Sequence, residues 1–229
     1  VGTGIYLTFR LGFLQIRTLP YALKLTFSRK QDKESEGDIS HFQALTTASA
    51  ATIGTGNIVG VATAIFLGGP GAVFWMFVAG LFGMATKYGE AILAVKYRVK
   101  DAQGNMAGGP MYYLEHALKH QWLGVLFAVF GALAAFGIGN GTQAKAVSDL
   151  MHDTFSIPAW VTGIALVIFA GLVILGGIKW IGRVTSYFVP FMAIFYILAG
   201  LYVMIANFQL VPDAIATIFT HAFSGEAAF

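Results

Sequence analysis

The amino-acid sequence predicts an all-α protein with several membrane-spanning helices. Charged residues make up 11% of the chain and hydrophobic residues 57%, and the mean hydropathy is +0.71. Soluble domains carry about 25% charged residues, so a water-soluble globule would have too little charge to cover its surface. The apolar runs are continuous over about 20 residues, the length at which a helix crosses a bilayer core, and they lack the alternation of barrel strands. Because the chain has no cysteine, a disulfide framework and thiolate metal sites are excluded.

Five apolar runs are long enough to span a membrane. They are residues 42–66, 72–95, 122–144, 158–177 and 187–206. Residues 1–16 are apolar but short and contain Arg10, so we expect the inner end of a further transmembrane helix that is truncated here. Residues 207–229 predict an extracytoplasmic interfacial helix that begins near Pro212 and leads to a span beyond this sequence.

Lysine and arginine gather in alternate connections between the runs. Residues 17–41, 96–121 and 178–186 hold nearly all the cations outside the apolar runs, whereas the intervening connections hold only Lys145. Cytoplasmic loops carry an excess of Lys and Arg, so the first set is predicted to be cytoplasmic. The basic isoelectric point, about 9.1, therefore reflects membrane topology, and we expect no nucleic-acid partner.

The first complete run, 42–66, is interrupted at its centre by the sequence ATIGTGNIVG at residues 51–60. Non-helical backbone at membrane depth is tolerated only where it is buried in protein or lines a wet cavity, so we expect a broken helix. The carbonyls near 51–54 would face a cation, and the amides near 56–58 would face an anion. Such a pair of helix ends suits an amino acid zwitterion and a sodium ion. The alternative is a glycine cluster that only kinks a closely packed helix.

A second polar run, GIGNGTQ at residues 137–143, lies in the run 122–144. Amide side chains are costly in lipid, so Asn140 and Gln143 are predicted to face the interior of the helix bundle. Gln143 has two interpretations that the residues alone do not separate. It either contacts the carboxylate or ammonium of a substrate, or it holds a neighbouring helix.

Lys87 and Glu90 are the only charges deep in a complete run, and their i,i+3 spacing places them on one helix face. We expect a structural ion pair near the inner boundary, with a proton relay through Glu90 as the alternative. The spacing of the histidines resembles no metal site. Neither Gly-x-Ser-x-Gly nor Gly-x-x-x-x-Gly-Lys-Ser/Thr occurs, so we expect neither an enzyme nor an ATP-driven pump.

Several segments, in order along nearly the whole chain, together resemble the sodium:alanine/glycine symporter family (alanine or glycine:cation symporters). They are GTGNIVGVATA at 54–64, GGPGAVFWM at 68–76, Lys87, Glu90, Tyr97-Arg98, GGPMYY at 108–113, GNGTQ at 139–143 and GGI at 176–178. The resemblance implies the architecture of the amino-acid/polyamine/organocation superfamily, in which two inverted five-helix repeats enclose a midplane site. Residues 42–206 would be the first repeat, with its first helix broken, and residues 1–16 an extra helix before it.

The resemblance also implies a function, namely the N-terminal half of a multi-pass secondary transporter of the cell inner (plasma) membrane. The expected cargo is a small neutral amino acid, alanine or glycine, carried with Na⁺, which is the coupling ion, and no organic cofactor is expected. The expected substrate-binding residues are Thr55, Gly56, Asn57, Ile58 and Gln143. The family pattern places sodium against backbone carbonyls such as those of Gly56 and Val59. Two alternatives stay open, namely a proton-coupled carrier that uses Glu90, and a channel or scaffold in which the glycines only pack helices.

Overall fold

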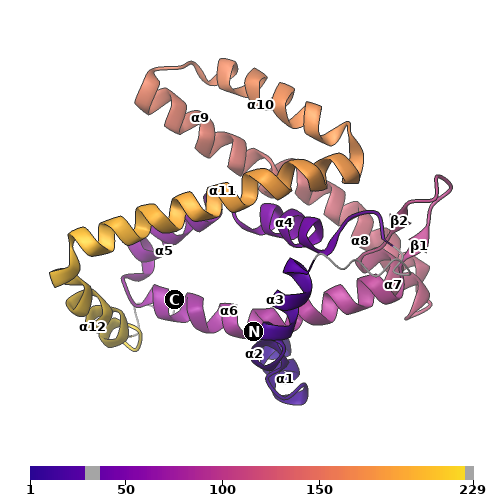
Figure 1. Cartoon of the computed structure of the whole chain (residues 1–229), viewed down its shortest axis with the longest axis horizontal. Helices are drawn as coiled ribbons and strands as arrows, with labels where there is room; N and C mark the ends of the chain where they lie inside the picture. Colours follow the sequence, from indigo (N-terminus) through magenta and orange to yellow (C-terminus); the bar gives the residue numbers. More distant parts are fainter. Residues whose placement is uncertain (29–36, 225–229) are drawn as a thin grey trace. The chain divides into compact units, whose positions relative to one another are not determined.

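A computed structural model describes residues 1–28 and 37–224, which are mostly helical (Figure 1). The chain divides into two compact units, and each is described by itself. The first consists of Val1–Ser40 and Leu81–Ile168, and the second of His41–Gly80 and Phe169–Phe229.

The first unit begins with three short helices and continues with longer ones. Its elements are α1 (Gly2–Arg10), α2 (Leu14–Arg17), α3 (Leu19–Phe27), the second part of α6 (Ala72–Lys96), β1 (Val99–Lys100), β2 (Met106–Ala107), α7 (Pro110–His116), α8 (Gln121–Ala134), the π-helical turn η2 (Ala135–Gly139), α9 (Gly141–Phe155) and the first part of α10 (Ala159–Ile174). Residues 1–16 are not one helix. Gly12 and Phe13 adopt left-handed φ values of 59° and 53° between α1 and α2, which stops the helix before it reaches the length of a span.

The predicted cytoplasmic segment 96–121 contains regular structure. β1 and β2 form an antiparallel hairpin whose turn is closed by Asp101, since the Asp101 carboxylate accepts the amides of Gln103 and Asn105 at 2.9 and 2.8 Å. The backbone N–H of Met106 donates to the carboxylate of Asp38 at 2.9 Å. This bond ties the hairpin to residues 37–40 of the same unit.

The second unit is built on the packing of α4 against α11. Its elements are α4 (His41–Thr52), the 3₁₀ turn η1 (Thr55–Asn57), α5 (Val59–Gly68), the first part of α6, the last part of α10, α11 (Gly177–Ala206), η3 (Phe208–Leu210) and α12 (Val211–His221). Pro212 lies in the first turn of α12, where a proline disturbs no helical hydrogen bond.

Helix α11 begins at Gly177, ten residues before the apolar run 187–206. The segment 178–186 is therefore helical, whereas a cationic loop was expected. The corner between α10 and α11 is short because two glycines make it. Gly177 has a φ of 66°, which favours glycine, and a Cβ on Gly176 would collide with the Trp180 side chain.

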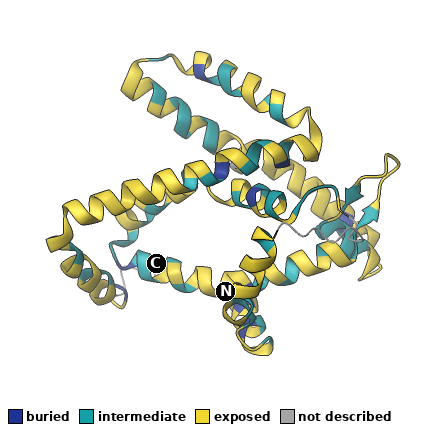
Figure 2. Cartoon of the chain, viewed as in Figure 1, coloured by how far each residue is buried: buried dark blue, intermediate teal, exposed yellow. Residues whose placement is uncertain are grey.

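Three described helices are long and apolar enough to cross a membrane, namely Ala72–Lys96, Gln121–Phe155 and Gly177–Ala206. The pair His41–Thr52 and Thr55–Gly68, bent by 60°, makes a fourth if it counts as one span, and α10 is a shorter apolar helix. Figure 2 shows that most of these helices are exposed along their length. Such apolar surface is typical of a protein whose helices contact lipid or further protein, as an integral membrane protein requires.

We expect Gly124→Ala to lower the unfolding temperature of the full-length protein in detergent. A Cβ on Gly124 would lie 2.7 Å from the carbonyl oxygen of Met111, and this overpacking between α7 and α8 costs about 1–3 kcal/mol. Gly131→Ala in the same helix is the matched control, because no atom lies within 4 Å of its Cβ position. Its unfolding temperature should hold or rise, since alanine favours a helix by about 1 kcal/mol. Equal unfolding temperatures for the two variants would contradict close packing of α7 on α8.

Candidate functional site

The centre of the candidate site is the interruption between α4 and α5. Helix α4 ends at Thr52 and α5 begins at Val59, and the two directions differ by 60°. Between them Gly54 is extended and residues 55–57 form one 3₁₀ turn. The interruption therefore falls inside the glycine-rich run that the sequence marks.

Two of the amides expected to face an anion are engaged within the interruption itself. The N–H groups of Asn57 and Ile58 donate to the carbonyls of Gly54 and Thr55, each at 3.1 Å. The helical bonds of α5 then begin with the N–H of Ala62, which donates to Ile58 at 3.1 Å. The amides of Asn57 and Ile58 are therefore engaged within the turn, and the positive end of the α5 dipole lies at its first-turn amides, residues 59–61.

The carbonyl end of α4 lies just before the turn. The N–H of Ile53 donates to the carbonyl of Ser49 at 2.7 Å, so the carbonyls of residues 50–52 have no following turn of helix to bond. They carry the negative end of the α4 dipole. The interruption thus presents partial charges of opposite sign within a few residues, which is the arrangement that a zwitterion or an ion pair requires.

Asn57 closes the turn through its own side chain. Its Oδ1 accepts the backbone N–H of Gly54 at 2.9 Å. Because the oxygen is engaged there, the Nδ2 amide is the part of Asn57 that can donate to an anion. Sequence reasoning assigned Asn57 to the substrate, and the structure gives it this positioning contact as well.

The two carbonyls expected to bind sodium differ in what surrounds them. The carbonyl of Val59 accepts the hydroxyl of Thr63 at 2.8 Å, so an ion at Val59 would compete with that bond. Gly56 has open space around its Cβ position. Among the described residues, no group of three His, Asp or Glu side chains is arranged to hold a metal ion.

Gln143 belongs to the first unit, whereas the interruption belongs to the second. It is half-buried in the first turn of α9, directly after the π-helical turn η2 and Asn140. Single π-helical turns occur frequently at functional sites. The role of Gln143 as a ligand stays a prediction.

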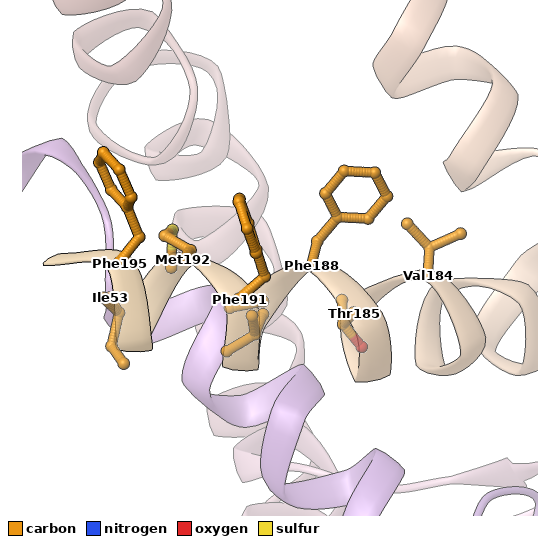
Figure 3. Close-up of a pocket in the computed structure, with 9 residues that line it drawn as sticks. Ile53, Val184, Thr185, Phe188, Phe191, Met192 and Phe195 are labelled. Carbon is orange, nitrogen blue, oxygen red and sulfur yellow. The ribbon is translucent and has the colours of Figure 1, made fainter. Parts of the chain in front are cut away.

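An apolar cavity of about 390 Å³ lies beside the interruption, and the sequence analysis did not predict it (Figure 3). Its lining comes from Ala50 and Ile53 of α4 and from α11, at residues 184, 185, 188, 189, 191, 192 and 195. Figure 3 shows the Thr185 hydroxyl as a polar group among apolar side chains. The lining residues of α11 recur with the 3.6-residue period of a helix, so the periodicity of the sequence is the signal that could have identified this face. Because its lining has so few polar groups, the cavity is suited to apolar contacts and not to binding a charged group.

Lys87 and Glu90 form the ion pair that their spacing predicts, with Nζ 2.7 Å from Oε2 on α6. Their side chains are 81% and 45% exposed in the described chain. Tyr113 of α7 lies near both charges. Burial raises the pKa of the Tyr113 phenol, the Glu90 carboxylate raises it further, and the Lys87 ammonium partly offsets them. The phenol therefore stays protonated at neutral pH and is no candidate for a base.

The chain is similar to membrane transporters over its whole length. A profile of the sodium:alanine symporter family matches residues 1–229. The sodium/alanine symporter AgcS of Methanococcus maripaludis is 61% identical over 233 residues, which cover 100% of this chain and 51% of that protein. An uncharacterized transporter of Haemophilus influenzae is 57% identical, over 99% of this chain and 50% of its own length. The probable sodium/glutamine symporter GlnT of Bacillus subtilis is 39% identical, over 98% and 47%. The chain thus spans about half the length of the curated relatives it matches.

We expect Asn57→Ala to destabilise the interruption by about 0.5–1.5 kcal/mol, because the Gly54 N–H loses its acceptor. Asn57→Asp is the matched control, since it retains an oxygen for that N–H. Thermal unfolding of the full-length protein measures the difference. If the aspartate variant were as unstable as the alanine variant, the contact with Gly54 would contribute nothing.

We expect either Lys87→Ala or Glu90→Ala to reduce the yield of folded protein, because the remaining charge lies in an apolar span without its partner. The double variant Lys87→Met, Glu90→Leu should recover much of that yield. Size-exclusion chromatography of the full-length protein measures the folded fraction. A double variant with a yield as low as the single variants would show that the charges do more than neutralise each other.

Proposed function

The chain belongs to the sodium:alanine symporter family, and we propose that the whole protein carries a small neutral amino acid, alanine or glycine, together with Na⁺. The observation that carries the proposal is the interruption of a transmembrane helix at residues 53–58, which sets a carbonyl end beside an amide end. The name of the relative at 61% identity supports the cargo and the ion. The proposal concerns a protein of about twice this length, in which the other half supplies further walls of the site.

The substrate carboxylate is proposed to face the amides of residues 59–61 and the Nδ2 of Asn57. Thr55, Gly56 and Ile58 lie between the two helix ends, where the backbone of a small amino acid fits against the open space at Gly56. The ammonium then faces the carbonyls of residues 50–52. Gln143 of the first unit is the further side chain proposed for this substrate.

Sodium is proposed to take oxygen ligands from the same interruption. Backbone carbonyls with no helical partner are suitable because Na⁺ is a hard cation held by oxygen. Gly56 fits this role better than Val59, whose carbonyl already accepts the Thr63 hydroxyl. The remaining ligands are proposed to come from the other half of the protein.

The proposed coupling supplies enough free energy to concentrate the substrate. One positive charge that moves inward across about 100 mV contributes about 2.3 kcal/mol, and a tenfold sodium gradient adds about 1.4 kcal/mol. Together they sustain a gradient of about several hundredfold for a zwitterion with no net charge.

The proposed setting is the plasma membrane, with residues 17–41, 96–121 and 178–186 on the cytoplasmic side. Residues 42–206 would form the first five-helix repeat of an inverted pair. The cationic residues Lys179 and Arg183 then lie in the first turns of α11, at the inner surface. Arg183 lies over the ring of Trp180, 5.5 Å from its centre, and an aromatic ring with a cation is typical of a membrane interface.

We expect full-length protein in proteoliposomes to take up labelled alanine only when a Na⁺ gradient is imposed, with saturation in both alanine and Na⁺. Gly56→Leu should abolish this uptake and leave the protein folded, because its Cβ position meets no atom of a residue distant in the chain within 4 Å, while the new side chain fills space that the substrate is proposed to occupy. Gly163→Leu in α10, also open at its Cβ position, is the control and should transport normally.

The alternatives give different results in the same assay. Uptake that follows a pH gradient, ignores Na⁺ and is lost in Glu90→Gln would favour a proton-coupled carrier. A flux that does not saturate and ignores both gradients would favour a channel. Unchanged half-saturation in Gly56→Leu would place the site elsewhere.

A further inference from the structure

The second unit contains two contacts that fasten α11 and α12 to opposite halves of the broken helix. One contact joins α4 to α11, and the other joins the corner between α5 and α6 to the end of α12. All the residues involved belong to this one unit.

The inner contact is a cluster of three threonine hydroxyls. Thr185 of α11 lies with its Oγ1 3.1 Å from the Oγ1 of Thr47 and 3.5 Å from that of Thr46, both on α4. Thr46 is almost fully buried, at 3% exposure. Thr185 also donates to the carbonyl of Gly182 in its own helix at 3.3 Å. A hydroxyl cluster between helices holds them together where hydrocarbon offers no other partner.

The outer contact is a close approach of two backbones. A Cβ on Gly71 would collide with the main chain of His221 and Ala222, so only glycine fits there. Beside it the indole N–H of Trp75 donates to the carbonyl of Ala222 at 2.7 Å. Ala222 is 1% exposed, so the acceptor side of this hydrogen bond is buried.

Aromatic rings surround the outer contact. Phe74 meets Phe219 and Phe223 of the α12 end at centroid distances of 5.7 and 5.5 Å, and Trp75 meets Phe223 at 5.8 Å. Gly69, with a φ of 68°, makes the turn by which α5 reaches this corner. The end of α5 is therefore fixed to the end of α12.

The segment between the two contacts is helical backbone, in which Pro190 of α11 has no N–H to donate. Helix α11 passes into η3 at Asn207, whose Nδ2 donates to the carbonyl of Val203 at 2.9 Å and whose carbonyl accepts the N–H of Leu210 at 2.9 Å. Figure 1 shows α11 running from its crossing with α4 to the elbow with α12. We call α11, η3 and α12 together the strap.

We propose that the strap sets the angle between the two halves of the broken helix, and that Thr185 and Trp75 are the positioning residues that fasten it. At the interruption itself, one 3₁₀ turn and the Asn57 side chain hold the backbone. The strap contacts α4 directly, and it contacts the corner that follows α5 through Gly71 and Trp75. The part of the test that measures transport rests on the proposed function. The part that measures the distance between the two half-helices does not.

The direct test measures the distance between the two half-helices. The 229 residues contain no cysteine, so spin labels can be placed at Ala48→Cys in α4 and Phe66→Cys in α5 of full-length protein whose other cysteines, where present, are replaced. Thr185→Val keeps the side-chain shape but loses the hydroxyl, and Trp75→Phe keeps an aromatic ring but loses the indole N–H and part of the ring surface. Each should broaden the distance distribution measured by double electron–electron resonance.

The matched controls remove similar groups that take no part in the two contacts of the strap. Ser186→Ala removes a hydroxyl that donates to Arg183 of its own helix, and Trp160→Phe removes an indole that is 69% exposed. Neither should change the distribution. Distributions unchanged by both Thr185→Val and Trp75→Phe in folded protein would overturn the proposal.

Transport kinetics of the same variants test whether the two contacts act as one device. Each single variant should raise the half-saturation for alanine and for Na⁺ together, by about two- to tenfold, the effect of one lost hydrogen bond. The double variant should show no more than the larger single effect, because release of either end frees the strap. Effects that multiply would indicate two independent local contacts and overturn it. If the variants broaden the distance distribution but neither they nor the unchanged protein transports alanine, the proposed function is wrong and the proposal about the strap is supported.

Discussion

A backbone that leaves the helix at membrane depth must still pair its amides and carbonyls, because hydrocarbon offers no water to do so. This constraint governs the second unit. Between Thr52 and Val59 the pairing is met locally by a 3₁₀ turn and by the oxygen of Asn57, which accepts the N–H of Gly54. The carbonyls that end α4 and the amides that begin α5 lie on either side of this turn, and they are the groups proposed to face a ligand.

The rest of the unit is arranged around that interruption. Helix α4 is held against α11 through threonine hydroxyls, and α5 is held at its far end by a corner in which Gly71 admits the backbone of α12. These contacts use few atoms and lie in partly buried surroundings, where a hydrogen bond is stronger than it is in water. The position of a half-helix is therefore decided by residues distant in sequence.

The long apolar runs and the glycine-rich interruption could be read from the sequence, because hydropathy and helix-breaking residues report them directly. The start of α11 could not, since Lys179 and Arg183 mark the edge of the apolar run while the helix continues through them. Long cationic side chains reach the interface from within a helix, so charge locates the membrane boundary and not the end of the helix.

The candidate site, too, could be predicted from the sequence only in part. Residue types predicted an anion-facing end and a cation-facing end, but the amides of Asn57 and Ile58, which were expected to face an anion, are taken by the 3₁₀ turn. The type of turn depends on backbone geometry that composition does not report. The threonine cluster was missed for a related reason, because Thr47 and Thr185 are 138 residues apart and nothing local in either helix marks the pairing.

The short helix α10 has a consequence for the lipid around the protein. Its 16 residues rise about 24 Å at 1.5 Å per residue, whereas the hydrocarbon core is about 30 Å thick. The two glycines at its corner with α11 leave no room to lengthen it at that end. In the proposed repeat, where α10 is one of the five spans, a mismatch of this kind would be met by thinning of the bilayer beside the helix, and the acyl-chain length of the surrounding lipid would then act on the protein without touching its binding site.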